Sequence, residues 1–264
     1  VLLQGFSNTL KWIAIVVILG AFIGEVLRET GGAQRISNAV IKWVGEKKIP
    51  WAMGITGYLV SIPVFVDVAY IVLQPITEGL ALRSKKPILV VGLALTAGLT
   101  VSHTLLPPTP GPLAVASLLE ADIGRLLLIN GFVGLMAMIG GILWATLFCK
   151  NYRLPDDDKL ATIAKNKQVD TKEINPKQWV LLDLLPILVP IFLMGLGAFF
   201  KADTPNLFYQ LIAFISLPMI AVLIGAAIAF LQYQLSSKKG TGNQLMEQAI
   251  VKSALVIMIT GAGG

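Results

Sequence analysis

The segment 100–112, TVSHTLLPPTPGP, places hydrogen-bonding and titratable side chains among four prolines. His103 can change its charge near neutral pH, and the hydroxyl groups beside it can donate or accept hydrogen bonds. Proline lacks a backbone N–H and interrupts a regular helix. We expect Gly111 and Pro112 to open a returning helix, whose free N–H groups and positive dipole end favour an anion. The hydroxyl-bearing candidates are Ser102, Thr104 and Thr109.

A second polar segment lies at 61–78, where an apolar stretch carries acidic and amide side chains. Pro63 can open a helix with Ser61 near its cap. A carboxylate deep in a bilayer costs about 2.5–3.5 kcal/mol, so Asp67 suits a role in proton or cation coupling. Spacings of three and four residues place four polar side chains on one helical face: Asp67, Tyr70, Gln74 and Glu78.

The composition indicates a membrane protein. Hydrophobic residues make up 55% of the 264 positions and charged residues 14%, against about 25% charged in an ordinary soluble domain. The mean hydropathy is +0.77. A chain this apolar has too few polar groups to cover the surface of a soluble protein, and it is too hydrophobic to be intrinsically disordered. The net charge of +6 therefore indicates basic loops on one side of a membrane rather than a nucleic-acid partner.

Continuously apolar runs indicate transmembrane helices rather than the alternating strands of a β-barrel. A polar loop at 150–177 separates two groups of these runs. We expect a partial first repeat at 1–149 and a truncated second repeat at 178–264. The runs are 9–27, 51–82, 88–120 and 126–149 before the loop, and 179–200, 207–231 and 245–264 after it.

The proline segment 100–112 lies inside the run 88–120. Irregular backbone at membrane depth is tolerated only where it is buried in protein or lines a wet cavity. We therefore expect this segment to break a crossing helix near the midplane. The alternative is a proline-rich turn at the membrane surface, with His103 capping a helix.

The basic residues indicate how the run 51–82 lies in the bilayer, because Lys and Arg gather in cytoplasmic loops. A single crossing would put the first two basic clusters on opposite sides. A re-entrant hairpin turning at Ser61, Ile62 and Pro63 makes all four clusters cytoplasmic, and they hold 17 of the 21 Lys and Arg. We favour the hairpin over one long, kinked span. The clusters lie at 28–48, 83–86, 150–177 and 238–239.

A glycine-rich segment occurs after the first run and again at the end of the chain. Residues 29–33 read ETGGA, and residues 260–264 read TGAGG. In the hairpin topology the first and last runs cross in opposite directions, as in transporters built from inverted repeats. Glycine-rich helix ends are also common in membranes, so both interpretations stay open. Because the chain starts and stops at apolar sequence, we expect it to be a piece of a longer membrane protein.

The sequence argues against an enzyme, a metal and a cofactor. It contains one Cys and one His, which excludes a cysteine cluster and a pair of His ligands. The signatures of metalloproteases, serine hydrolases and ATP-driven proteins, namely H-E-x-x-H, G-x-S-x-G and Walker A, do not occur. We therefore expect no metal site and no cofactor.

Four stretches resemble the gluconate permease (GntP) family of bacterial proton-coupled symporters. The most specific is S-H-x-L-x-P-P-x-P-G-P-L-A at 102–114, followed by A-D-x-G at 121–124. The others are GEVLRETGGAQRI (24–36), SIPVFVDVAYIVLQPI (61–76) and ITGAGG (259–264). The resemblance runs in order along essentially the whole chain.

The resemblance implies a secondary active transporter of the bacterial inner membrane that carries gluconate or a related hydroxylated carboxylate with protons. It implies an all-α polytopic fold with two inverted repeats, each holding a re-entrant hairpin and a broken helix, as in the ion-transporter superfamily. The family pattern carries Glu where this chain has Asp67, so the acid is kept but shortened. Alternatives are a Na⁺-coupled carrier, a passive anion channel and a membrane-embedded enzyme.

Together the residues and the resemblance predict one substrate site. The carboxylate would bind at the helix start and the nearby hydroxyls, and Asp67 and His103 would carry the coupling proton. The expected partners are the substrate, protons or Na⁺, and membrane lipid, and a homo-oligomer stays open because no dimer motif stands out. The expected substrate-binding residues are Ser61, Gln74, Ser102, His103, Thr104, Thr109, Gly111, Pro112, Thr260 and Gly261.

Overall fold

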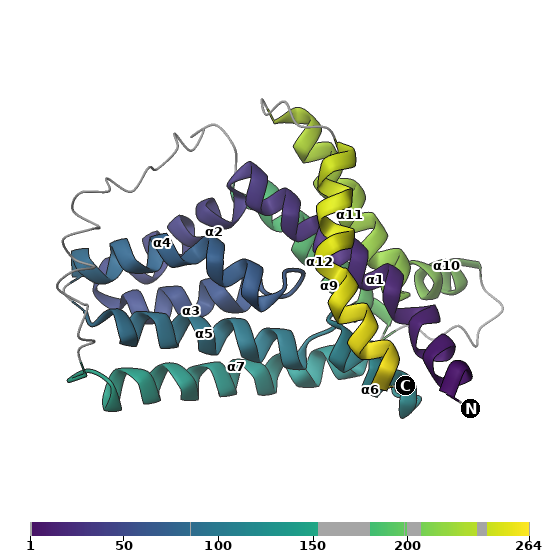
Figure 1. Ribbon diagram of the computed structural model, residues 1–264, viewed down its shortest axis with the longest axis horizontal. Coiled ribbons are helices and arrows are strands. Elements are labelled where there is room, and N and C mark those ends of the chain that lie inside the picture. Colours follow the sequence, from purple (N-terminus) through teal and green to yellow (C-terminus); the bar gives the residue numbers. More distant parts are fainter. Residues whose placement is uncertain are drawn as a thin grey trace.

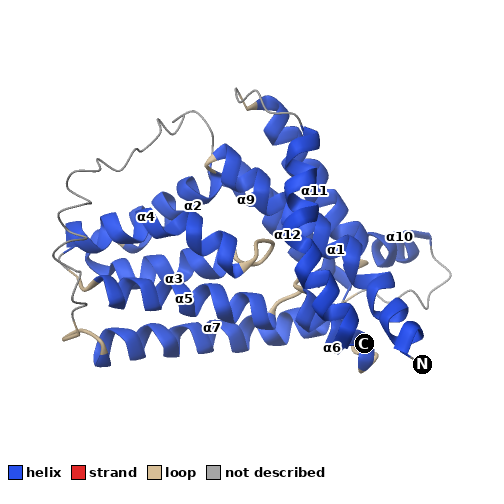
Figure 2. Ribbon diagram, viewed as in Figure 1, coloured by secondary structure: helices blue, strands red, loops and turns tan. Residues whose placement is uncertain are grey.

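The computed structural model describes residues 2–84, 86–152, 180–197, 199, 207–236 and 242–263. Within these ranges the chain forms helices and loops without a strand (Figure 2), which confirms the all-α prediction. The expected cytoplasmic loop, 150–177, lies almost entirely outside the described residues. The proposed division into two repeats stays a prediction.

The helices fall into two series, one on each side of that loop. Within the described residues, four segments are long and apolar enough to cross a membrane, and they are Ile88–Leu118, Ile123–Phe148, Val180–Gly197 and Pro218–Leu235. The first series is α1 (Leu2–Thr30), α2 (Gly32–Val44), the short 3₁₀-helix η1 (Glu46–Lys48), α3 (Ile49–Val60), α4 (Val66–Ser84), α5 (Ile88–Leu105), α6 (Pro110–Leu118) and α7 (Ile123–Phe148). The second series is α9 (Val180–Gly197), α10 (Leu207–Ile215), α11 (Pro218–Leu235) and α12 (Gly242–Gly263).

Helix α2 occupies part of the segment 28–48, which we expected to be a basic loop. Gly31 separates it from α1 with a φ of 75°, a left-handed conformation that glycine adopts readily. Its apolar side chains recur at helical spacing, and Ile36, Val40 and Ile41 are buried. Arg35 is buried on the same element, so this cluster is only partly solvated.

The run 51–82 folds as two helices joined by a turn. Helices α3 and α4 lie side by side in opposite directions, with residues 61–65 between them (Figure 1). This is the helical hairpin predicted around Ser61 and Pro63; whether it is re-entrant depends on the position of the bilayer.

Helix α3 also packs on α5 through glycines. A Cβ added to Gly98 would lie 2.0 Å from the carbonyl oxygen of Gly54, and one added to Gly57 would lie 2.6 Å from that of Leu95. Small residues allow membrane helices to approach closely. The hairpin is therefore held against α5 by backbone contact rather than by large interlocking side chains.

The stretch 207–231, expected as one span, is divided into α10 and α11. Pro218 occupies the start of α11, where its missing N–H is tolerated. The hydroxyl of Ser216 donates to the carbonyl of Ala213 at 2.9 Å and closes the preceding turn. Pro218 therefore accounts for the break, which the continuously apolar sequence around it does not reveal.

Helices α1 and α12, the first and last of the described chain, pack against each other in opposite directions (Figure 1). Lys252 contacts Glu25, whereas a Cβ on Gly261, further along α12, would lie 2.6 Å from the ring of Phe6, near the start of α1. Both helices also contact α6, and α1 contacts α4 of the hairpin, so residues from both ends of the chain approach the proline segment.

Candidate functional site

The turn of the hairpin meets the break between α5 and α6. Residues of the two segments share one small cavity with α1, and the ring centroids of Phe65 and His103 lie 5.8 Å apart in an edge-to-face arrangement. The Ser61 hydroxyl is buried and donates to the carbonyl of Val64 at 3.2 Å, which fixes the turn. The cavity has a volume of about 10 Å³, roughly enough for one water molecule.

The break itself runs from Leu106 to Thr109, as the prolines predicted. The amide of Asn130, on α7, donates to the carbonyl of Leu105 at 2.9 Å and satisfies the end of α5. The hydroxyl of Thr109 donates to the carbonyl of Leu106 within the break. Because Asn130 lies in the first third of α7, the break is displaced from the middle of that helix.

The start of α6 differs from the expected anion site. The helix begins at Pro110, two residues before Pro112, and prolines contribute no N–H. Gly111 therefore supplies the single N–H of positions 110–112, while the N–H of Leu113 already bonds to the carbonyl of Thr109 at 3.3 Å. A Cβ on Gly111 would meet nothing within 4 Å. The helix start is open, but one amide is a weak basis for holding a carboxylate.

The hydroxyls near the break are in three different states. Ser102 is fully buried, and its Oγ has no hydrogen-bond partner among the described residues. A buried hydroxyl without a partner costs free energy, but Ser102 lines neither the small cavity nor the groove, so a ligand would reach it only if the break moved. Thr104 is exposed and donates to the carbonyl of Thr100 at 2.8 Å. Thr109 is buried and engaged within the break.

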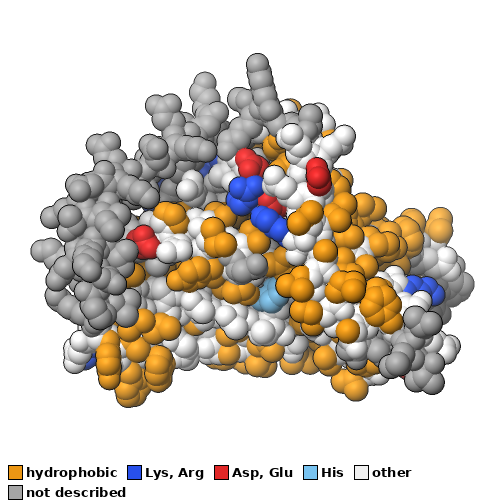
Figure 3. Space-filling model, in the orientation of Figure 1, with side chains coloured by type: hydrophobic (Ala, Val, Ile, Leu, Met, Phe, Trp, Pro, Cys, Tyr) orange, Lys and Arg blue, Asp and Glu red, His pale blue; other side chains and the backbone are white. Residues whose placement is uncertain are grey.

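A larger groove lies beside the small cavity, between α4, α5 and α12. Its volume is about 680 Å³, within the range typical of small-molecule sites. His103 borders both spaces, and Phe65 does so too. The pale-blue histidine surface is visible in this hollow in Figure 3. The polar side chains that line the groove are Tyr70, Thr96, His103 and Lys252.

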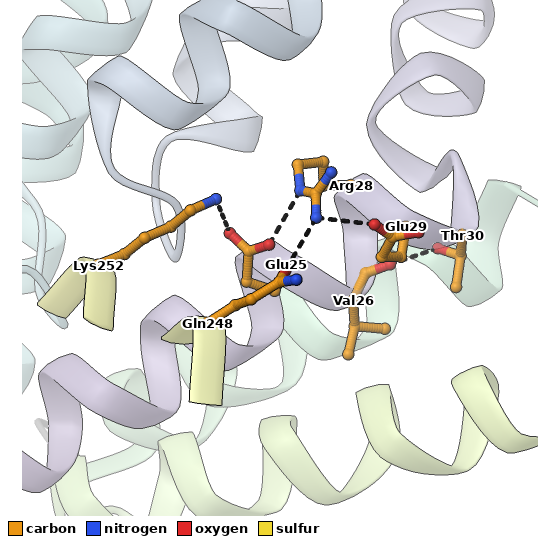
Figure 4. A network of polar contacts seen from close by, with 7 residues as sticks. All are labelled: Glu25, Val26, Arg28, Glu29, Thr30, Gln248 and Lys252. Carbon is orange, nitrogen blue, oxygen red and sulfur yellow. Dashed lines mark hydrogen bonds and ion pairs between the residues drawn. The ribbon is translucent and has the colours of Figure 1, made fainter. Parts of the chain in front are cut away.

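A network of charges reaches the groove through Lys252, which lines it (Figure 4). Glu25 is 1% exposed, accepts a hydrogen bond from Nε of Arg28 at 2.9 Å and pairs with Lys252 of α12. Arg28 also reaches Oε1 of Gln248 at 3.1 Å and Oε1 of Glu29 at 2.7 Å. The network thus joins α1 to α12 next to the groove.

A second ion pair is sealed between α2 and α9. Arg35 and Asp183 are 6% and 5% exposed, and the guanidinium donates to both carboxylate oxygens at 2.6 Å. Nη1 of Arg35 donates to the carbonyl of Thr30 at 2.7 Å, which ties down the end of α1. Asp183 therefore has a specific partner on another helix.

The remaining predicted residues are scattered. Gln74 is exposed and donates to Glu78 at 2.9 Å, and it lines neither the small cavity nor the groove. Gly261 packs on α1. Asp67 lies in the first turn of α4 between Val66 and Tyr70, two residues that line the groove. The side chains of Asp67 and Thr260 lie outside the described part of the structure.

Several polar residues of this region were not singled out from the sequence. Asn130 satisfies the end of α5 at the break. Lys252 lines the groove and pairs with Glu25 behind it. The sequence did contain a signal for Glu25 and Lys252, because charged residues inside apolar membrane-spanning runs are costly and tend to be functional. Within the described residues no group of three or more His, Cys, Asp or Glu is placed to hold a metal ion.

Comparison with known proteins identifies the family. The family model for GntP family permeases matches residues 1–264. An uncharacterized permease of Haemophilus influenzae is 35% identical over 99% of this chain and 56% of its own length. The Gnt-II system L-idonate transporter of Escherichia coli is 30% identical over 99% and 59%, and a gluconate permease of Pseudomonas aeruginosa is 31% identical over 99% and 58%.

The chain thus spans somewhat more than half the length of these curated relatives. No solved structure matches it. The match covers the hairpin, the broken helix and both ends of the described chain. The chain belongs to the GntP permease family.

Proposed function

We propose that this chain belongs to a secondary active transporter that carries gluconate, or a related small hydroxylated carboxylate, with protons across the bacterial inner membrane. The observation that carries the proposal is that the hairpin turn and the broken helix meet at His103, beside a groove that is also lined by Lys252. The substrates named for the relatives, gluconate and L-idonate, support the substrate class.

In this proposal α3 and α4 form a re-entrant hairpin. Helix α3 has 12 residues, about 18 Å at the usual helical rise, and the hydrocarbon core is about 30 Å thick. Helix α3 is therefore too short to cross, whereas the 26 residues of α7 reach about 39 Å. The same topology keeps the basic clusters on one side, and the opposite directions of α1 and α12 support an inverted relationship between the two repeats.

The groove and the break together form the proposed substrate site. A six-carbon acid fits the volume of about 680 Å³, and the buried Ser102 hydroxyl and His103 lie at the break. Hydroxyl groups of the substrate can bond to Thr96 and Tyr70 on the wall of the groove. Gly111 adds one N–H at the start of α6.

Protons and substrate would bind cooperatively in this site. A proton on His103 adds a positive charge, and a proton on Asp67 removes a negative one. Either change favours a bound anion, and by linkage the anion favours the proton equally. Movement of one bundle against the other would then expose the loaded site to the opposite side.

Uptake by the intact protein in proteoliposomes tests the proposal. With an inward proton gradient we expect labelled gluconate to accumulate above its external concentration, and we expect collapse of the gradient to release it. Accumulation that requires Na⁺, and is lost when choline replaces Na⁺, would instead support a sodium-coupled carrier. Conductance without accumulation would identify a passive channel.

A further inference from the structure

Behind Lys252, the charged residue that lines the groove, lies a carboxylate that is nearly inaccessible. Glu25 is 1% exposed and is contacted by cations from two helices, Arg28 of α1 and Lys252 of α12. Such a group is costly to bury unless it is paired. The pairing is visible in Figure 4, where both cations point at the same carboxylate.

The two cations are held differently. Arg28 contacts Glu25, Glu29 and Gln248, so three groups fix its guanidinium. Among the described residues Glu25 is the ion-pair partner of Lys252, and 35% of the lysine side chain is exposed. Lys252 also lines the groove. A lysine has three donors on a flexible stem, so Lys252 can turn towards a ligand in the groove while Arg28 stays on Glu25.

The groove that Lys252 lines also presents hydroxyl and imidazole groups. Tyr70 comes from α4 and Thr96 and His103 come from α5, whereas Leu255 and Val256 extend the wall along α12. One cation together with hydroxyl and imidazole groups in the same groove matches a molecule with one carboxylate and several hydroxyls. The start of α6 is a poorer place for the carboxylate, because it offers one N–H in positions 110–112.

We propose that Lys252 binds the carboxylate of the transported acid and exchanges between that carboxylate and Glu25, which takes up the coupling proton when Lys252 leaves it. The proposal rests on the proposed function but assigns the coupling proton to Glu25 in place of Asp67 and His103. A substrate carboxylate next to Glu25 places two negative charges at one part-buried site, and a proton on Glu25 removes their repulsion. The proton comes from the aqueous side that faces the groove.

Other ionisable groups surround this exchange and set its electrostatic background. Arg28 and Glu29 lie on α1 beside Glu25, and Tyr70 and His103 lie across the groove. The Arg35–Asp183 pair lies beyond Thr30, at the end of α1, and is neutral as a unit. Arg28 stays with Glu25 throughout, so the change in charge is confined to Lys252, Glu25 and the ligand.

The first test compares Lys252→Gln with the double variant Glu25→Gln/Lys252→Gln in the intact protein. Gluconate affinity of each purified protein is measured by calorimetry, and thermal stability in detergent is measured alongside. If Lys252 only neutralises Glu25, the double variant regains wild-type affinity, because no charge is left unpaired. If Lys252 contacts the substrate, the double variant regains stability but binds gluconate about tenfold more weakly or worse. Wild-type affinity in the double variant overturns the proposal.

The second test uses Glu25→Gln, which keeps the shape of the side chain and removes its proton site. We expect exchange of labelled for unlabelled gluconate to continue, whereas accumulation driven by an inward proton gradient is lost. Accumulation at the wild-type level overturns the role of Glu25. If Lys252→Gln fails to fold, Glu25→Gln still tests whether proton uptake at Glu25 drives accumulation.

Matched controls are available on exposed positions. Glu247→Gln removes a carboxylate from α12 one turn earlier, and Lys42→Gln removes a cation from α2; both side chains are exposed. We expect both variants to bind and accumulate gluconate like the wild type. A wild-type protein that neither binds nor transports gluconate, L-idonate or another small hydroxylated carboxylate refutes the proposed function itself, whereas normal behaviour of all Glu25 and Lys252 variants refutes this inference alone.

Discussion

Two buried carboxylates, Asp183 and Glu25, are each paired with cations from another helix, yet their surroundings differ. Arg35 and Asp183 are both nearly inaccessible and meet through two parallel hydrogen bonds. Glu25 is equally buried, but its partner Lys252 is about one-third exposed and lines a groove. Among the described residues, neither Arg35 nor Asp183 lines the small cavity or the groove, whereas Lys252 lines the groove. This difference separates a pair that holds helices together from a pair that can respond to a ligand.

The largest effect is expected at the sealed pair. Asp183→Asn keeps the shape of the side chain but leaves the Arg35 guanidinium buried without a counter-charge, which costs about 3–5 kcal/mol. Unfolding of the detergent-solubilised intact protein in denaturant measures the loss. Asp122→Asn is the matched control, because Asp122 caps α7 in an exposed position and Asn caps a helix as well as Asp does. Equal losses in the two variants would contradict the distinction between a sealed pair and an exposed one.

Replacing both members of the sealed pair sharpens the same point. In Arg35→Met/Asp183→Leu no charge is left unpaired, and apolar residues of similar size often match or exceed the stability of a buried pair. We expect the double variant to recover most of the free energy lost by Asp183→Asn. If the double variant does not recover this free energy, the lost hydrogen bond from Arg35 to Thr30, rather than the charge balance, dominates the stability of this site. The same denaturation experiment measures both variants.

The sequence predicted the interruptions of the helices better than these pairs. The turn after α3 and the break after α5 follow from Ser61–Pro63 and from the prolines of 107–112, because proline restricts the local backbone wherever it occurs. The division at Pro218 has the same cause and was missed because the apolar run around it is continuous. Local chemistry of this kind can be interpreted from a single chain.

Contacts between distant residues could not be predicted in the same way. Arg35 and Asp183 are 148 positions apart, and Glu25 and Lys252 are 227 apart. A buried charge in an apolar run signals that a partner exists, but only packing decides which residue it is. The anion site expected at Gly111 and Pro112 is weaker for a local reason: α6 begins at Pro110, and the two prolines leave one N–H in positions 110–112. The candidate site therefore shifted from the helix start towards the groove.

A smaller effect, with opposite signs for stability and binding, is expected at Ser102. Its hydroxyl is buried with no partner in the described structure, so Ser102→Ala should leave stability unchanged or raise it by up to about 1 kcal/mol. If the hydroxyl meets the substrate, gluconate affinity falls about three- to tenfold. Thermal unfolding and calorimetry on the same preparation measure the two effects.

Ser37→Ala is the comparison for this variant. Ser37 is equally buried on α2, and its hydroxyl lies 3.8 Å from the sulfur of Met53, away from the groove. We expect its gluconate affinity to match that of the wild type. If the Ser102→Ala protein loses stability and keeps its affinity for gluconate, Ser102 has a structural role, as the Arg35–Asp183 pair does.

The smallest effect is expected at the outer edge of the open network. Glu29 pairs with Arg28 at 2.7 Å, and its side chain is 37% exposed, so Glu29→Gln should cost at most about 1 kcal/mol. Salt screens exposed charges more than buried ones. The difference between wild type and Glu29→Gln should therefore shrink as salt is raised, while the loss caused by Asp183→Asn should stay nearly constant. Denaturation at low and high salt measures both, and a sealed pair as sensitive to salt as Glu29 would show that water reaches Asp183.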